Sequence, residues 1–201
     1  KDKNRIIKEM KLGEIDILIG TQMVVKGHHF PNVTLVGVIA ADSSLNIDDY
    51  RANERTFQIL TQVAGRAGRE KLPGNVIIQT YNPDNYSIQY SKKQNYEEFY
   101  NVEIKLRKQL RYPPFCDIIM FGISGEREEI VSKTANQLYA NLHKKIQQED
   151  IAANILKPLP APIDKIKNRY RWRIIIKSEV NDKLIEIINE CLYDKELLKN
   201  N

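Results

Sequence analysis

Short apolar runs alternate with apolar residues at helical spacing along the first third of the chain. Ile6, Ile7 and Met10 fall on one face of a helix, and the run 15–19 that follows predicts a compact buried strand. The stretch 33–41 is nearly all apolar and β-branched, which is typical of a central parallel strand covered on both faces. The pattern therefore predicts one helix and two strands of the same sheet in this region.

A further helix and strand continue the alternation. Asp48 or Asp49 can cap a helix over residues 50–63, and a strand is expected over 75–80. Strands that alternate with helices indicate an α/β fold, in which helices flank a parallel sheet. We therefore predict an α/β lobe that covers residues 1–82.

A helical connector is expected next, over residues 83–114. Two helical segments, about 84–91 and 96–110, lead to Tyr112-Pro113-Pro114. Because two consecutive prolines forbid continuation of a helix, this tripeptide marks a domain boundary.

The remaining residues, 115–201, predict a small α+β domain. Its expected elements are, in chain order, a strand over 117–124, a helix over 128–147, a strand near Ile155, a Pro-rich loop, a strand over 171–177 and a helix over 181–193. This order is that of a split βαβ, ferredoxin-like domain. The fold class is thus α/β, a lobe with a parallel sheet followed by a smaller α+β domain.

Charge and cysteine usage narrow the class of protein. The net charge of +5 and the pI of about 9.0 suit a polyanionic partner such as nucleic acid. Cys116 and Cys191 show no CxxC spacing, so neither a disulfide framework nor a zinc site is supported and a reducing cytoplasm fits best. No export signal and no apolar run of about 18 residues occurs, so we expect no membrane association.

Two arginines at the end of the predicted 50–63 helix carry the strongest chemical signal. Arg66 and Arg69 lie three residues apart and can reach the same anion, while Gly65 and Gly68 keep the backbone close to it. Gln62, one turn earlier, can orient a water molecule or an arginine. A guanidinium suits a transferring phosphoryl group because it stays charged and binds oxygens in pairs. The alternative is an ordinary helix end, at which the arginines interact favourably with the helix dipole and the glycines end the helix.

A second polar segment runs from Gly20 to Phe30, directly after the expected strand over 15–19. Its position places Thr21 and the amides that follow at a helix N-terminus, where phosphate is commonly held. Thr21 is therefore a candidate contact to a DNA backbone. His28 and His29 do not indicate a metal site, because adjacent side chains point apart and no other Cys or His lies near in sequence.

These two segments, in this order and about 40 residues apart, resemble motifs V and VI of superfamily-two helicases. The sequence between them narrows the resemblance to one family, that of primosomal protein N′, whose members are replication restart helicases. This resemblance extends over about 50 continuous residues. The matching features are the His28-His29-Phe30 triplet, Asp42 and the segment Glu54-Arg55-Thr56-Phe57-Gln58. A weaker match continues through Tyr112-Pro113-Pro114-Phe115 and Tyr170-Arg171-Trp172-Arg173. The resemblance implies that residues 1–82 are part of a second RecA-like helicase lobe.

The resemblance also implies roles for individual residues. Arg66 and Arg69 would face the γ-phosphate of ATP held by the other motor lobe, with Arg69 as the arginine finger and Gln62 in support. Gly65 and Gly68 would lie beside the nucleotide. Thr21 and Gly27 would couple the DNA backbone to the ATP cleft, where His29 also stands at a position that many related helicases give to an aspartate.

Several groups that such a motor needs are absent from this sequence. It contains no GxxxxGK[ST] phosphate loop and no acidic Walker-B segment, so ATP and Mg²⁺ would be bound mostly by a first lobe outside this chain. The family's zinc region would likewise lie upstream. We therefore expect no ATP hydrolysis by this chain alone. The chain also ends at Lys199-Asn200-Asn201, where the family usually has one more short strand.

A basic run at period two lies in the C-terminal domain. Its five cations are Lys165, Lys167, Arg169, Arg171 and Arg173, and the residues between them include Ile166, Tyr170, Trp172 and Ile174. On one extended strand the cations would share a face and track phosphates, with the aromatic residues and Trp172 in particular on the core side. A charged, solvated edge is the alternative. The resemblance favours DNA, because the family's C-terminal domain is similar to a small ribosomal protein fold and contributes to binding branched DNA.

The function that the resemblance implies is an ATP-dependent 3′ to 5′ DNA helicase that recognises stalled forks and restarts replication by primosome assembly. Its partners would be branched and single-stranded DNA, primosome loading proteins and single-stranded-DNA-binding protein. The alternatives are another superfamily-two translocase or a non-catalytic DNA- or partner-binding module. Asp42 and Glu54 are either acid–base groups or structural partners of Arg51 or Arg55.

Overall fold

The computed structural model describes residues 2–21, 30, 32–65 and 74–193. Its contacts divide the chain into two compact units, Lys1–Ile104 and Lys105–Asn201. The predicted connector, 83–114, contains the helices α5 and α6, and the second of these crosses from one unit into the other. The domain boundaries at residues 82 and 114 remain predictions.

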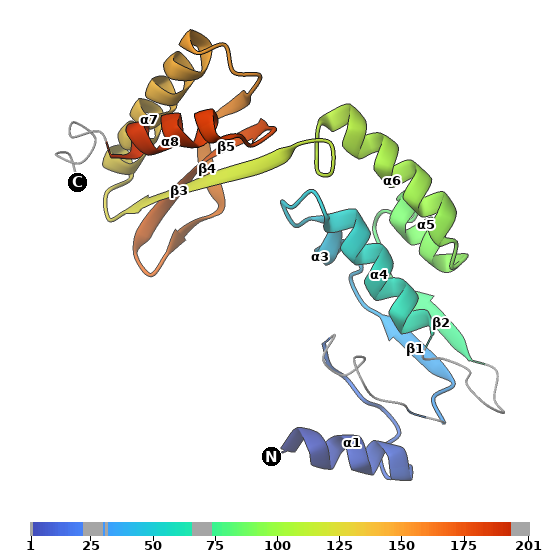
Figure 1. Cartoon of the computed structure of the whole chain (residues 1–201). Helices are drawn as coiled ribbons and strands as arrows, with labels where there is room; N and C mark the ends of the chain where they lie inside the picture. The colour runs from blue at the N-terminus through green and yellow to red at the C-terminus, as the bar shows by residue number, and fades with distance from the viewer. Residues whose placement is uncertain (1, 22–29, 31, 66–73, 194–201) are drawn as a thin grey trace. The chain divides into compact units, whose positions relative to one another are not determined.

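The first unit is built around a parallel pair of strands. Its elements, coloured blue to green in Figure 1, are α1 (Asp2–Leu12), β1 (Leu35–Val38), α3 (Asp42–Leu45), α4 (Ala52–Ala64), β2 (Asn75–Ile78), α5 (Tyr86–Lys92) and α6 (Tyr96–Leu110). The strands pair in register from Leu35 with Asn75 to Val38 with Ile78. Helix α4 connects them, which gives the α/β unit that the alternation predicts.

Aromatic side chains hold α5 and α6 against α4. The rings of Phe57 and Phe99 stack with their centroids 4.2 Å apart, and Tyr86 lies against Phe99 at 5.8 Å. The hydroxyl of Tyr86 also donates a hydrogen bond to the carboxylate of Glu103 at 2.6 Å. Phe99 and Glu103 are buried because they share one face of α6, four residues apart.

The second unit is a three-stranded antiparallel sheet with two helices. Its elements are β3 (Asp117–Gly125), α7 (Glu128–Gln148), β4 (Asn154–Ile166), β5 (Arg169–Ser178) and α8 (Asp182–Leu192). The strand order β3-β5-β4 places β5 between the two strands that α7 connects, which is the split βαβ arrangement. The ferredoxin-like order of elements predicted from the sequence is therefore present.

One face of this sheet carries the core. Ile174 and Ile176 of β5 are fully buried against apolar residues of α7 and α8, among them Leu142 and Leu184. Asn181 caps α8, because its side chain accepts a hydrogen bond from the backbone N–H of Leu184 at 2.9 Å. Both helices belong to the same core, so the opposite face of the sheet is left for other contacts (Figure 1).

Two predictions for strands in the first unit are wrong. Residues 15–19 form no strand, and Ile17 and Ile19 are 77% and 87% exposed. An extended segment becomes a strand only by pairing with another one, and no described segment pairs with this one. Strand β1 is also shorter than expected and alternates exposed with half-buried residues, instead of being covered on both faces.

The Pro-rich segment predicted as a loop is part of β4. This strand lies at the edge of the sheet and pairs with β5 alone among the described strands, so its prolines need not donate to a second neighbour. The register shifts between Leu156 and Leu159 and again between Pro160 and Lys165. The prolines therefore distort the edge strand without ending it.

A candidate motor segment and a candidate nucleic-acid interface

Helix α4 ends where the sequence predicts the phosphate-sensing segment. Gly65 is its C-cap residue and donates its backbone N–H to the carbonyl oxygen of Thr61 at 3.1 Å. Gln62 is exposed one turn earlier. The structure thus places two of the predicted nucleotide-side residues at one helix end. Arg66, Gly68 and Arg69 lie outside the described residues.

The predicted DNA-side segment is described only at its ends. Thr21 is exposed and has no regular secondary structure. Gly27 and His29 lie outside the described residues, as does His28. The expected helix N-terminus after Thr21 therefore remains a prediction.

The exposed face of α4 carries a row of polar side chains that leads to Gln62. Arg51, Arg55, Gln58 and Gln62 recur at spacings of four, three and four residues, which places them on one side of the helix. The buried residues of α4, such as Phe57 and Leu60, lie on other sides of the helix. Among the residues that the structure describes, the predicted motor residue Gln62 is therefore one of four members of a longer polar face.

Asp49 organises the first two members of this row. Its carboxylate accepts hydrogen bonds from Nε and Nη2 of Arg51 at 3.1 Å each, and Nη1 of Arg55 lies 2.8 Å away. These interactions, the hydrogen bond from the Arg51 side chain above all, hold the pKa of Asp49 below its ordinary value. The sequence indicates Asp49 only as a helix cap, so its role as the main partner of both arginines is a finding of the structure.

Asp42 has a different role, at the carboxyl ends of both strands. Its carboxylate accepts hydrogen bonds from the hydroxyl of Thr80 at 2.7 Å and from the backbone N–H groups of Tyr81 and Asn82 at 2.8 and 3.2 Å. The bond from Tyr81, followed by that from Thr80, keeps the pKa of Asp42 below its ordinary value. These bonds favour the structural alternative for Asp42, although its partners are Thr80 and two backbone N–H groups and not Arg51 or Arg55, which pair with Asp49.

Glu54 lies in the first turn of α4. Its carboxylate accepts a hydrogen bond from the side-chain amide of Gln58 at 3.1 Å, one turn further along the helix. Asp49 raises the pKa of Arg51 most, through a hydrogen bond and its charge, and the charge of Glu54 raises it further. These interactions favour a structural role for Glu54, which is one of the two alternatives that the sequence leaves open.

The face of the C-terminal sheet that lies opposite the core carries a row of arginines. Successive residues of a strand point to opposite faces, so Arg169, Arg171 and Arg173 alternate with Tyr170, Trp172 and the buried Ile174. Because β5 is the central strand, this row runs along the middle of the face. Nη2 of Arg169 donates a hydrogen bond to the carbonyl oxygen of Ser124 at 3.0 Å on the neighbouring strand.

Apolar side chains flank the arginine row on both sides. Met120 of β3 pairs with Ile175, and Leu159 of β4 pairs with Arg173, so both lie on the arginine face. Met120 is 63% exposed and Leu159 is 58% exposed. We call this surface, formed by the arginine row with Met120 and Leu159, the open face. A cationic row with apolar flanks can bind a ligand that is anionic along one line and apolar beside it.

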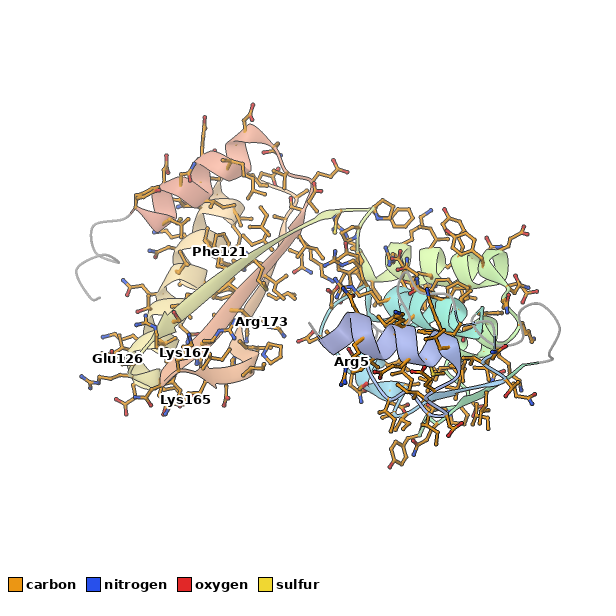
Figure 2. The ribbon with its side chains drawn as sticks, turned by 90° about the horizontal axis from the view of Figure 1, so that it is seen from below. Arg5, Phe121, Glu126, Lys165, Lys167 and Arg173 are labelled. Carbon is orange, nitrogen blue, oxygen red and sulfur yellow. The ribbon has the colours of Figure 1, made fainter. Side chains whose placement is uncertain are left out.

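The prediction that all five cations share this face is wrong. A two-residue turn, Lys167-Asn168, divides the run between β4 and β5, so Lys165 pairs with Tyr170 on the core-side face. The Lys165 Nζ atom lies 4.3 Å from the centroid of the Tyr170 ring and 3.1 Å from its hydroxyl oxygen. Figure 2 shows Lys165 and Lys167 at one end of the sheet and Arg173 further along it.

The residues between the cations divide in the same way. Ile166 lies on the open face because it pairs with Arg169, although strict alternation with the cations along one strand would place it on the other face. The core-side placement of Trp172 is confirmed, although this residue is half-buried. The turn therefore places the residues before it on the face opposite to the one that a single strand predicts. The residues of β5 lie on the faces that were predicted.

Two further features concern metals and membranes. Among the residues that the structure describes, no group of three or more His, Cys, Asp or Glu side chains is placed to hold a metal ion. None of the described helices combines the length and apolar character of a membrane span.

Comparison with known protein families assigns a class to each unit. The model of the helicase conserved C-terminal domain matches residues 1–71, and that of the primosomal protein N C-terminal domain matches residues 108–197. The fold is therefore a helicase C-terminal lobe of α/β type followed by a small α+β domain.

Individual relatives agree with this assignment. The chain is 44% identical to the replication restart protein PriA of Bacillus subtilis over 92% of its own length, and 46% identical to that of Synechocystis over 86%. PriA of Chlamydia muridarum is 41% identical over 94% of the chain. The matches cover 23%, 20% and 24% of these relatives, so the chain spans less than a quarter of their length. The chain belongs to the PriA family, and its match lies in the helicase and PriA C-terminal domains.

Proposed function

We propose that this chain is the C-terminal part of an ATP-dependent 3′ to 5′ DNA helicase that recognises stalled replication forks and restarts replication by primosome assembly. The single observation that supports DNA binding most directly is the open face, where Arg169, Arg171 and Arg173 lie in one row on the central strand. The PriA name of the relatives supports the role in replication restart.

The proposal divides the work between the two units. The first unit supplies the nucleotide-sensing end of α4, where the exposed Gln62 and the half-buried Gly65 precede Arg66 and Arg69 in sequence. ATP and Mg²⁺, which would supply the energy of strand separation, are bound mostly by another lobe, and zinc belongs to a further part of the parent protein. The second unit binds DNA. Primosome loading proteins and single-stranded-DNA-binding protein are its proposed protein partners.

The open face suits phosphate recognition on physical grounds. Each guanidinium presents a planar fork of donors to phosphate oxygens, and it is less strongly hydrated than an ammonium group. Residues two apart on a strand lie about 6.6 Å from each other, which is close to the spacing of consecutive phosphates along a nucleic-acid strand. Neighbouring arginines of the row can therefore contact neighbouring phosphates.

Substitution of the proposed finger tests the motor assignment. In the longer protein of which this chain is a part, Arg69→Ala should abolish DNA-stimulated ATP hydrolysis, a loss of about a thousandfold or more, while DNA affinity changes little. Arg127→Ala is the matched control, because Arg127 is an exposed arginine in the second unit. ATP hydrolysis that survives Arg69→Ala would show that the finger is another residue.

A further inference from the structure

The β4–β5 hairpin ends in an exposed basic tip. The turn Lys167-Asn168 joins the paired residues Ile166 and Arg169, and every residue from 163 to 169 is exposed. We call residues 163–169 the hairpin tip. Together with Arg171, this segment contains four cations and one carboxylate, that of Asp164. Glu126 lies at the same end of the sheet (Figure 2).

The cations of the tip point to both faces of the ribbon and beyond its end. Lys165 pairs with Tyr170 on the core-side face, whereas Arg169 lies on the open face. Lys167 occupies the turn itself. A ligand with anionic groups on one side alone could contact only some of these cations. A ligand with anionic walls on two sides could contact the cations of both faces.

Lys167 adopts a backbone conformation that does not suit lysine. Its φ is +48° and that of Asn168 is +62°, the pair of left-handed residues that a type I′ hairpin turn requires. Glycine or asparagine is the usual residue at such positions, because a β-carbon crowds the backbone there. The turn thus carries an exposed positive charge at a position where glycine or asparagine is usual.

We propose that the hairpin tip enters the major groove of duplex DNA as a two-stranded ribbon, with Lys165 and Arg169 directed at the phosphates of opposite walls and Lys167 at the floor. This inference rests on the proposed DNA binding and specifies the form of DNA. The major groove is about 12 Å wide and admits a two-stranded β-ribbon, and phosphates line both of its sides. The deep major groove of RNA is too narrow for such a ribbon.

The tip does not fit a single strand equally well. Single-strand binding usually combines cations with exposed aromatic rings on which bases stack. Tyr170, the aromatic residue that follows the tip in the sequence, is half-buried, and its ring lies under the Lys165 ammonium group. The exposed apolar side chains at the tip are those of Ile163 and Ile166, at 60% and 41%. Aliphatic groups of this kind can contact thymine methyl groups in the major groove.

The first experiment compares duplex and single-stranded DNA of the same sequence and about 21 nucleotides, two helical turns. Binding of the full chain is followed by fluorescence anisotropy across a salt series. Lys167→Gly should weaken duplex binding about three- to tenfold and reduce the salt slope by about 0.9, with less than a twofold change for the single strand. Its melting temperature should be unchanged or higher, because glycine relieves the left-handed residue.

Two control variants separate charge from turn geometry. Asn168→Gly changes the same turn without loss of charge, and Lys144→Ala removes an exposed lysine near the C-terminal end of α7, a helix that begins at the tip end of the sheet. Both should leave the duplex salt slope unchanged. If Lys167→Gly behaves like Asn168→Gly, or weakens both DNA forms equally, the hairpin tip does not occupy a duplex groove.

Groove ligands provide the second measurement. Methyl green, which occupies the major groove, should displace the chain from duplex DNA, whereas netropsin, which occupies the minor groove, should not. Displacement by netropsin alone would overturn the assignment of the groove. Failure of the unaltered chain to bind either form of DNA would refute the proposed function itself, whereas binding without a Lys167 effect would refute only this inference.

Discussion

Lys177 lies over the ring of Tyr112, with its Nζ atom 3.7 Å from the ring centroid, and donates a hydrogen bond to the carbonyl oxygen of Leu110 at 3.1 Å. Leu110 is the last residue of α6, where unpaired carbonyl groups favour a cation. Lys177 belongs to β5, the central strand of the C-terminal sheet. One side chain therefore ties the end of α6 and the Tyr112-Pro113-Pro114 segment to this strand.

Removal of the Lys177 charge should destabilise the second unit. Lys177→Met keeps most of the apolar stem but removes the hydrogen bond and the cation–π interaction, so we expect the free energy of unfolding to fall by about 1 kcal/mol. Thermal unfolding followed by circular dichroism measures the change. Lys157→Met is the matched control, because Lys157 is an exposed lysine of the edge strand β4. Equal melting temperatures for the two variants would contradict the assigned role.

Asp42 should make the first unit sensitive to acid. Because its pKa is lower in the folded chain than in the unfolded chain, its contribution to stability is present above the ordinary carboxyl pKa and is lost as the pH falls through the folded value. Asp42→Asn should lower the melting temperature at pH 7, since an amide has one oxygen to serve Thr80, Tyr81 and Asn82. The difference from the unaltered chain should narrow below about pH 4. A difference that is independent of pH would show that the carboxylate charge is not involved.

Local signals in the sequence are sufficient to predict most of the helices. The bounds predicted for α6, 96–110, agree with the structure because the apolar spacing is regular and two prolines follow it. The strands β3 and β5 and the helices α7 and α8 also follow from their patterns within one to two residues. The strand prediction fails over residues 15–19 because strand formation depends on a distant partner, which a local apolar run does not identify.

The hairpin tip shows why a periodic pattern can mislead. Cations at every second position from Lys165 to Arg173 indicate one extended strand, yet a turn lies within the run. Neither turn residue is glycine, so the usual sign of a type I′ turn is absent, and Asn168 is the one local hint. The main partner of Arg51 and Arg55 is equally hard to predict, because several carboxylates lie near in sequence and only the fold selects Asp49.

The candidate motor site can be predicted only in part from residue chemistry. Spacing and side-chain type point to Gln62 and the arginines after it, and the structure places Gln62 on an exposed face of α4 that begins at Arg51. The assignment of Arg69 as the arginine finger, and the roles of Gly27 and His29, rest on the family resemblance. These residues would act at a cleft with another lobe, so a single lobe does not contain the partners that define their functions.

The open face makes the central prediction of this account. Replacement of Arg169, Arg171 and Arg173 by glutamine should weaken binding of the chain to branched DNA and reduce the salt slope by up to about 0.9 for each phosphate that is no longer neutralised. Glutamine keeps a long hydrogen-bonding side chain, so the sheet should remain folded. Replacement of Lys105, Lys144 and Lys183 by glutamine removes the same charge from the helices α6, α7 and α8 and serves as the control.

The most direct test is therefore a salt series of branched-DNA binding by the unaltered chain and these two triple variants, with ATP hydrolysis assayed in the same samples. We predict that the arginine variant binds more weakly and with a smaller salt slope than the unaltered chain, that the lysine variant largely retains both affinity and slope, and that no sample hydrolyses ATP. Equal salt slopes for the two variants, or ATP hydrolysis by the chain alone, would contradict the account.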